Sequence, residues 1–303
     1  MSVESAILIT GGTGFFGKSI MDYFLRHECK NDYIVLSRNP EKFLNQNPQF
    51  AGNKHFSFLQ GDVRDFRIPD SLPIDRIIHA ATPADNITAD EEMHSIIVDG
   101  TAHVLDVAKS KQVKRILYIS SGAVYGKQPD DVERIPETQK CEPLTVYGKS
   151  KLEAEKMCLA SGIETVIARC FAFVGKYLPK DKHYAIGNFM DDCLHDRSIV
   201  IQGDGTALRS YLYADDLVEW LMTALENSIA GRAYNIGSET AYSIREIAEH
   251  VKAALGTGNS IQILGKPQQQ GKVSRYIPDV SKIKSELNVK EKYSFDEMIK
   301  KSK

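Results

Sequence analysis

The chain has 303 residues, of which 42% are hydrophobic and 26% are charged, and its formal net charge at pH 7 is -2. This composition is typical of a globular domain or two, and it excludes disorder, a coiled coil and a fibrous repeat. The near-neutral charge predicts no nucleic-acid partner, and the apolar stretches are far below the ~20 residues of a membrane span. The start of the chain runs into a strand-like segment, so we expect no signal peptide and a cytoplasmic location.

The five cysteines are scattered and contain no CxxC pair, which favours reduced thiols over a disulfide framework or a zinc site. We therefore expect no metal.

The first half of the chain alternates short, fully apolar runs with longer helical patterns. Such runs, bounded by helices, indicate βαβ units and a parallel sheet covered on both faces. The predicted fold class is therefore α/β, a Rossmann-type doubly wound sheet. We expect strands at 6–10, 33–37, 56–59, 76–79, 115–120 and 165–169, and helices at 15–26, 91–109 and 146–160.

The rhythm changes after about residue 170, where turn-rich stretches interrupt shorter helices. We expect residues 1–170 to form a dinucleotide-binding Rossmann domain and residues 171–303 to form mainly a smaller C-terminal α/β lobe for the substrate. Some later segments, such as 234–237 (YNIG), are expected to return to the first domain. The active site is expected in the cleft between the two.

A glycine-rich turn, residues 10–17 (TGGTGFFG), joins the first strand to the first helix. Gly11 permits the tight turn, Gly14 lets the backbone approach a pyrophosphate, and Gly17 lets the helix pack closely on the strand. The helix that opens at Phe15 and Phe16 offers backbone N–H groups to phosphates. Because the motif lies between a strand and a helix, it predicts a dinucleotide site rather than a simple glycine turn.

The end of the second strand is expected to select the coenzyme. NAD-binding sheets carry a carboxylate there, about 20 residues after the glycine turn, whereas this chain has Ser37 and Arg38. A guanidinium can pair with the 2′-phosphate of NADP, so NADP is favoured, with NAD as the alternative. Asp62 and Val63 follow the third strand, where Asp62 either accepts a hydrogen bond from the adenine or caps a turn.

Tyr147 and Lys151 stand four residues apart on a predicted helix, so they share one face. Reduction of a carbonyl, or its reverse, needs a positioned proton donor whose pKa is brought toward neutrality. A neighbouring ammonium stabilises the phenolate of a tyrosine, and Lys151 can also hold the ribose of the nicotinamide half. Ser121, at the end of the fifth strand, can donate to the same substrate oxygen.

In this order these segments resemble the extended short-chain dehydrogenase/reductase family, and within it the NAD-dependent epimerase/dehydratase branch that acts on nucleotide-activated sugars. The resemblance covers nearly the whole chain. It includes 79–82 (HAAT), which implies coenzyme contacts at Ala80 and Ala81, and 208–216 (LRSYLYADD) of the second lobe. The resemblance also implies that Ser121, Gly122, Tyr147, Asn188, Arg209 and Arg275 contact the substrate, with both arginines on its diphosphate.

The departures from the family pattern narrow the chemistry. Family dehydratases place an Asp-Glu pair after the hydroxyl residue of strand five, and decarboxylating members use a glutamate there, whereas this chain has Gly122 and Ala123. Ala172 and Ile97 stand where asparagines are common. The spacing of the carboxylates Asp85 and Glu137 does not recommend either as a substitute. His79 is expected to be packed and His183 to lie in a loop, and neither is the expected base.

Three functions remain open. The first is an NADPH-dependent 4-ketoreductase of a nucleotide-activated sugar, with Tyr147 as proton donor. The second is a 4-epimerase that uses the same residues and keeps NAD tightly bound. The third is a protein that only senses a dinucleotide, which the intact Ser121, Tyr147 and Lys151 argue against. The resemblance also implies a homodimer formed through the helices at 91–109 and 146–160.

Overall fold

A computed structural model describes residues 5–28, 30–83, 88–180, 184–256, 258–266 and 273–303. Cys29, Asp85 and His183 lie outside these ranges.

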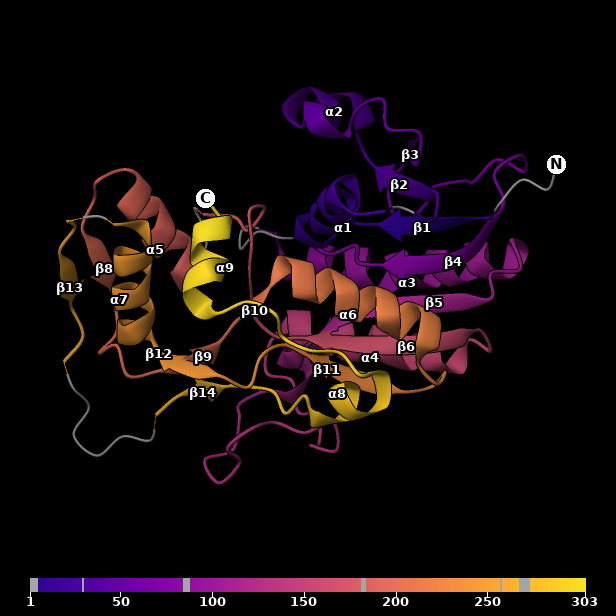
Figure 1. The fold of residues 1–303 in the computed structure, drawn as a ribbon. Coiled ribbons are helices and arrows are strands. Elements are labelled where there is room, and N and C mark those ends of the chain that lie inside the picture. The colour runs from indigo at the N-terminus through magenta and orange to yellow at the C-terminus, as the bar shows by residue number, and fades with distance from the viewer. Residues whose placement is uncertain (1–4, 29, 84–87, 181–183, 257, 267–272) are drawn as a thin grey trace. The chain divides into compact units, whose positions relative to one another are not determined.

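The chain is built around a seven-stranded sheet with the order β11-β6-β5-β4-β1-β2-β3 (Figure 1). Strands β1 to β6 pair in parallel, and the order 3-2-1-4-5-6 is that of a doubly wound sheet that reverses between β1 and β4. The fold class predicted from the sequence is thus confirmed. The strands are β1 (Ala6–Thr10), β2 (Tyr33–Ser37), β3 (Phe56–Gln60), β4 (Ile74–His79), β5 (Arg115–Ser121), β6 (Glu164–Cys170) and β11 (Ala233–Ile236).

One face of this sheet is covered by α3 (Asp90–Ser110) and α4 (Val146–Ala160), which pack against each other. Alternate residues of the strands, such as Leu8, Ile77 and Ile116, enter one core with apolar residues of these two helices. The expected helices and strands are all found, with ends that differ by at most two residues. Shorter elements complete this part: α1 (Phe15–Arg26), α2 (Pro40–Gln46), η1 (Pro48–Phe50), η2 (Gly122–Tyr125) and α6 (Ala214–Asn227).

Spatial contacts divide the chain into two compact units. Unit 1 comprises Met1–Gly126, Lys140–Cys170 and Trp220–Tyr234, and unit 2 comprises Lys127–Gln139, Phe171–Glu219 and Asn235–Lys303. Residues 127–139 therefore fall in unit 2, whereas the expected division of the chain placed them in the first domain.

Unit 2 holds three small sheets, with the orders β10-β7, β12-β9-β14 and β13-β8, and short helices of which α5 packs on α7 and α7 on α9. Its elements are β7 (Phe173–Val174), α5 (Ala185–Leu194), β8 (Ile199–Ile201), β9 (Leu208–Ser210), β10 (Leu212–Tyr213), β12 (Ala241–Ser243), α7 (Ile244–Leu255), β13 (Ile261–Ile263), β14 (Arg275–Tyr276), α8 (Ser281–Leu287) and α9 (Phe295–Lys301).

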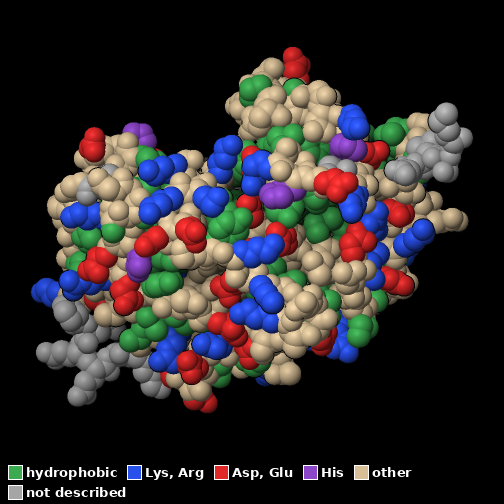
Figure 2. Space-filling model, viewed as in Figure 1, with side chains coloured by type: hydrophobic (Ala, Val, Ile, Leu, Met, Phe, Trp, Pro, Cys, Tyr) green, Lys and Arg blue, Asp and Glu red, His purple; other side chains and the backbone are tan. Residues whose placement is uncertain are grey.

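Acidic and basic side chains are interspersed over the face shown in Figure 2. Among the described helices, none combines the length and the apolar character that a membrane crossing needs.

Candidate active site

The glycine turn of unit 1 is shaped by close backbone approaches. Gly11 has a φ of +66°, and a Cβ built on it would lie 2.5 Å from the carbonyl oxygen of Ala80. Only glycine fits there, because both the left-handed conformation and the approach of β4 exclude a side chain. A Cβ on Gly17 would lie 2.2 Å from the carbonyl oxygen of Gly12, so α1 packs on the turn itself. The turn and the end of β4 are thereby held together.

The start of α1 suits a phosphate. Its N-cap residue, Gly14, makes no side-chain cap hydrogen bond, and the first turn, which opens with Phe15 and Phe16, contains no acidic residue. A Cβ on Gly14 would meet only the Gly11 carbonyl oxygen, at 3.3 Å. An uncapped helix N-terminus beside open space favours an anion. These residues fit the pyrophosphate of a dinucleotide.

A chain of buried hydrogen bonds connects the turn to α3 through His79. The Thr101 hydroxyl donates to the Ile97 carbonyl oxygen at 2.5 Å, so it must accept from Nε2 of His79 at 2.9 Å. Nδ1 of His79 then accepts from the Thr10 hydroxyl at 2.6 Å, and the Thr10 oxygen accepts from the backbone N–H of Ala81 at 3.3 Å. One tautomer of the imidazole satisfies every bond.

Burial lowers the pKa of His79 to about 3, so this side chain is neutral. It is packed, as the sequence predicted, and it fixes the segment that begins at Ala80. Ile97, where the family pattern often has an asparagine, is 1% exposed and belongs to the core.

The tip of β2 carries no carboxylate. Ser37 is buried, and its Oγ accepts from the backbone N–H of Asn39 at 3.2 Å. Asn39 in turn caps α2 by accepting from the N–H of Lys42 at 2.9 Å. Arg38, between them, is exposed. The guanidinium that the sequence assigns to coenzyme selection is therefore accessible to a ligand.

Asp62 is engaged in a turn and in an ion pair. Its Oδ1 accepts from the backbone N–H of Arg64 at 3.1 Å and from Nε of Arg64 at 2.8 Å. The hydrogen bond from Arg64 lowers the pKa of Asp62, and the charge of Arg38 contributes in the same direction. Asp62 is thus ionised and caps the turn. The side chain of Val63 is buried against Gly100, so only the backbone of Val63 could contact a coenzyme.

Tyr147 and Lys151 lie in the first half of α4. The helix begins after Thr145, whose hydroxyl accepts from the N–H of Gly148 at 3.1 Å. Lys151 is 2% exposed, and its Nζ donates to the carbonyl oxygen of Ile119 at 2.8 Å and lies 6.0 Å from the ring centre of Tyr147. Burial lowers the pKa of Lys151 to about 8. The Lys151 ammonium, with its lowered pKa, therefore lies near the phenol ring of Tyr147.

Ser121 is the last residue of β5, and its Oγ accepts from the N–H of Ala123 at 3.1 Å, which caps η2. The first turn of α4 packs directly on η2, because a Cβ on Gly148 would lie 2.7 Å from the carbonyl oxygen of Ala123. Gly148, for which the sequence predicted no role, thus brings the Tyr147 end of α4 against the segment that follows Ser121. Gly122 and Ala123 bring no acid or base to this place.

The structure also contains a buried ion pair, between Glu155 and Arg169, that was not predicted from the sequence. Glu155, on α4, is 2% exposed and accepts from Arg169 of β6, from Nη2 at 2.8 Å and from Nε at 3.1 Å. Nη1 of Arg169 donates to the Tyr125 hydroxyl at 3.0 Å, and the Ser120 hydroxyl donates to Glu155. The sequence feature that could have indicated Glu155 is its spacing: it follows Lys151 by four residues, so it lies on the same face of the helix as Tyr147 and Lys151.

Three predicted substrate residues lie in unit 2. Asn188 is on α5, and its Oδ1 is buried without a hydrogen-bond partner among the described residues. Arg209, on β9, donates from Nη1 to the Leu208 carbonyl oxygen at 2.8 Å. Arg209 is level with Tyr276, and Arg275 is level with Leu208. Since side chains alternate along a strand, the two arginines leave this sheet on opposite faces.

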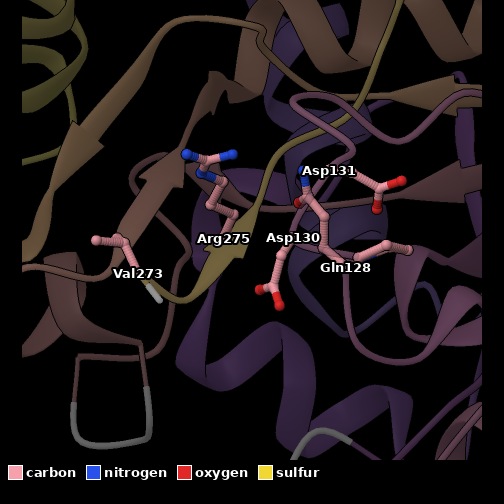
Figure 3. A pocket seen from close by; sticks show the side chains of 6 residues that line it. Gln128, Asp130, Asp131, Val273 and Arg275 are labelled. Carbon is pink, nitrogen blue, oxygen red and sulfur yellow. The ribbon is translucent and has the colours of Figure 1, made fainter. Parts of the chain in front are cut away.

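Arg275 lines a pocket of about 320 Å³ within unit 2 (Figure 3). Gln128 anchors its wall by donating to the carbonyl oxygens of Val132 and Glu133, both at 2.9 Å, and by accepting from the N–H of Ile277 at 3.0 Å. With an arginine and two carboxylates, the pocket suits a hydrogen-bonding ligand. Its lining residues are Gln128, Pro129, Asp130, Asp131, Val273 and Arg275.

Glu137 and Ala172 have structural partners in unit 2. Glu137 accepts from the backbone N–H of Asn235 at 2.8 Å, and burial raises the pKa of this carboxyl. The carbonyl oxygen of Ala172 accepts from the N–H of Leu212 at 3.1 Å. Within the described ranges, no three His, Cys, Asp or Glu side chains are grouped to hold a metal.

The sequence model of the NAD dependent epimerase/dehydratase family matches residues 7–237. The chain belongs to this family. The resemblance stated from the sequence is thereby confirmed, and with it a dinucleotide-dependent enzyme class that acts on nucleotide sugars.

Curated relatives match almost the whole chain. UDP-glucuronic acid decarboxylase 1 of Arabidopsis thaliana is 28% identical over 96% of this chain and 67% of its own length. UDP-glucuronic acid decarboxylase 6 of the same plant is 30% identical over 93% of this chain and 82% of its own length. Among solved structures, UDP-glucose 4-epimerase of Thermotoga maritima, described with UDP-glucose, superimposes with a TM-score of 0.84 at 23% identity and covers 98% of this chain and 97% of its own.

UDP-glucuronic acid 4-epimerase of Bacillus cereus, described in complex with NAD, gives the same TM-score at 23% identity, with 98% of this chain and 96% of its own covered. At this identity the likeness establishes the fold.

Proposed function

We propose that this family member is an NADPH-dependent 4-ketoreductase of a nucleotide-activated sugar, such as a 6-deoxy-4-keto sugar. The observation that carries the proposal is the composition of the site: Tyr147 and the buried Lys151 lie beside a segment, Gly122–Ala123, that has no acid or base. Such a site supports transfer of a hydride and a proton, and it lacks the groups that an elimination requires. The family pattern places a glutamate in this segment for decarboxylation, and this chain has none, so we propose that it does not share the reaction of the relatives named decarboxylases.

Each residue of the proposed site has a defined task. The chemistry that NADPH would supply, when held in this site, is a hydride for the keto carbon. Tyr147 gives its phenolic proton to the oxygen that becomes a hydroxyl, and Ser121 donates a hydrogen bond to the same oxygen. Lys151, with a pKa of about 8, is mostly protonated at pH 7, so its ammonium stabilises the phenolate that remains. The same ammonium can also donate to the ribose hydroxyls of the nicotinamide half.

The coenzyme assignment depends on the tip of β2. Ser37 replaces the carboxylate that would repel a 2′-phosphate, and the exposed Arg38 is placed to pair with one. The uncapped start of α1 is proposed to take the pyrophosphate. Asp62 and Val63 are proposed for the adenine, and Ala80 and Ala81 for the middle of the dinucleotide.

The substrate residues stay proposals. Asn188 is a candidate for a sugar hydroxyl, because its buried Oδ1 lacks a partner among the described residues. Arg209 and Arg275 are proposed for the diphosphate. Because the register of β9 and β14 places them on opposite faces of their sheet, it favours contact of the diphosphate with one of them rather than with both together. Gly122 is proposed to leave room for the sugar.

A 4-epimerase is the second candidate. The observation in its favour is the similarity to solved proteins that are described as 4-epimerases, one of them with NAD. Such an enzyme would use Ser121, Tyr147 and Lys151 in both directions and would retain its coenzyme. A protein that only senses a dinucleotide would have no need for these three side chains.

We further propose that the protein is cytoplasmic and that it forms a homodimer through α3 and α4. The four described cysteines are free thiols, which suits a reducing compartment. Leu159 of α4 is 47% exposed, so this helix presents an apolar side chain that a second subunit could cover.

The test is to incubate the purified protein with dTDP-4-keto-6-deoxyglucose and its UDP, GDP and CDP counterparts, with NADPH or NADH, and to follow coenzyme oxidation. Stoichiometric oxidation of NADPH with a 4-hydroxy product supports the ketoreductase. Interconversion of a UDP-hexose pair by protein that carries NAD from purification would instead establish the epimerase.

A further inference from the structure

We propose that Glu155 and Arg169 are positioning residues for this reaction, because they fix the rotation and the register of α4 against the sheet and so hold Tyr147 and Lys151 opposite Ser121. The inference rests on the proposed function, in which these three side chains act on one carbonyl oxygen.

The ion pair ties α4 to three segments around the site. Both oxygens of Glu155 accept from Arg169 of β6, and the Ser120 hydroxyl of β5 donates to the same carboxylate. Arg169 extends the network to η2, where it donates to the Tyr125 hydroxyl and lies 5.0 Å from the centre of that ring. Ser120 directly precedes Ser121, and Tyr125 closes η2. The groups that hold Glu155 are therefore chain neighbours of the groups that must face Tyr147.

The spacing on the helix transmits this constraint. Tyr147, Lys151 and Glu155 follow one another at intervals of four, so they lie along one face of α4. At a rise of about 1.5 Å per residue, Glu155 lies ~12 Å along the helix from Tyr147. At the start of the helix, Gly148 allows close packing of α4 on η2. Two turns later, Glu155 holds the helix to β6 through Arg169. A rotation of α4 about its axis would move both reactive side chains.

A buried ion pair is a costly way to stabilise a protein. Apolar residues of similar volume often stabilise as well or better, because burying two charges removes their hydration. What the pair adds is a strict geometry. A planar guanidinium pairs with a carboxylate in only a few orientations, whereas leucine and methionine side chains can pack in many. The pair therefore fixes the position of α4 relative to β6 more strictly than apolar contacts would. We therefore assign this pair to placement of α4 rather than to stability.

The carboxylate also affects the charge of Lys151. The groups that face this ammonium are Tyr118 of β5, Tyr147, Glu155 and Cys158 of α4, Cys170 of β6 and His79 of β4. Burial lowers the pKa of Lys151, and the negative charge of Glu155 opposes that shift. Removing the charge lowers the pKa further, so the activity of the protonated lysine should be lost at a lower pH.

The experiment separates geometry from charge. In the double variant Glu155→Leu with Arg169→Met, both charges are removed together so that neither is left unpaired. Glu155→Asp keeps the charge and shortens the side chain. Glu153→Gln is the matched control, because Glu153 lies on the same helix, is 53% exposed and pairs with the exposed His94 rather than with a group of the site.

The measurements are kcat and KM as functions of pH, and the affinities for NADPH and for its adenosine fragment 2′,5′-ADP. We expect the double variant to fold and to lose about 10- to 100-fold in kcat. Because it removes a positive charge together with the negative one, its alkaline loss of activity should move less than removal of the carboxylate alone would move it. NADPH should bind more weakly while 2′,5′-ADP binds as before, because the proposed contact of Lys151 is with the nicotinamide half alone. Glu155→Asp should lose kcat with its alkaline limb unmoved, and Glu153→Gln should match the parent.

Two failures are distinguishable. A parent protein that binds neither NADPH nor NADH would overturn the proposed function, and this inference with it. A parent that binds the coenzyme and reduces a keto-sugar, together with Glu155→Asp and double variants of unchanged kcat and NADPH affinity, would overturn the inference alone. If the double variant does not fold, Glu155→Asp decides the question by the same measurements.

Discussion

Replacing Lys151 with methionine should make the protein more stable and nearly inactive. Methionine fills a similar volume and brings no charge into the core. The pKa of Lys151 lies at about 8 against an ordinary value of 10.5. The difference of 2.5 pH units corresponds to about 3 kcal/mol that the folded state loses at pH 7 by holding a buried ammonium. The lost hydrogen bond to Ile119 offsets about 1 kcal/mol of the gain, so we expect a net rise of about 2 kcal/mol.

The sign of the pH dependence follows from proton binding. Between pH 8 and 10.5 the unfolded lysine holds a proton that the folded one has released, so the parent gains stability as the pH rises through this window. The advantage of Lys151→Met should therefore be largest below pH 8 and should reach zero before pH 10.5, above which only the cost of the lost hydrogen bond remains. Urea unfolding at a series of pH values measures it, and turnover at pH 7 should fall at least about 100-fold. A variant that is less stable than the parent at pH 7, or whose advantage is the same at every pH, would refute the reasoning.

Three further predictions concern the coenzyme, the proton donor and the excluded reaction. Arg38→Ala should erase a preference for NADPH over NADH of about 1.5–3 kcal/mol, measured by titration calorimetry, and equal affinities in the parent would contradict the assignment and favour an NAD epimerase. Tyr147→Phe should lose at least about 100-fold in turnover and keep its affinity for the coenzyme, whereas near-normal turnover would place the proton elsewhere. Because Gly122 and Ala123 offer no acid or base, UDP-, dTDP-, GDP- and CDP-hexoses with an intact 6-hydroxyl should give no 4-keto-6-deoxy product. The assay is the alkaline absorbance of such a product after incubation with the enzyme, and a catalytic signal would show that another group supplies the acid and the base.

The sequence predicted the sheet well because its strands are buried on both faces and are therefore apolar throughout, as in β1 and β2. It also predicted the turn at Gly11, since local conformation demands glycine there. Contacts between distant segments were out of reach. Glu155 and Arg169 are 14 residues apart, and the partners of His79 lie 69 and 22 residues away. The opposite faces of Arg209 and Arg275 depend on the register of β14, a two-residue strand whose place no local pattern indicates.

The position of β11 at the edge of the central sheet has a consequence for synthesis on the ribosome. Strand β6 is the neighbour of β11, and Ile167 and Phe171 donate their N–H groups to the carbonyl oxygens of Arg232 and Ile236. While the intervening 60 or so residues are still being translated, the edge of β6 has no partner strand, and an unpaired hydrophobic edge is a template for aggregation. Nascent chains of this protein should therefore depend on chaperones until residue 236 has left the exit tunnel, and a fragment that ends at residue 170 should be aggregation-prone even though it contains the entire glycine turn.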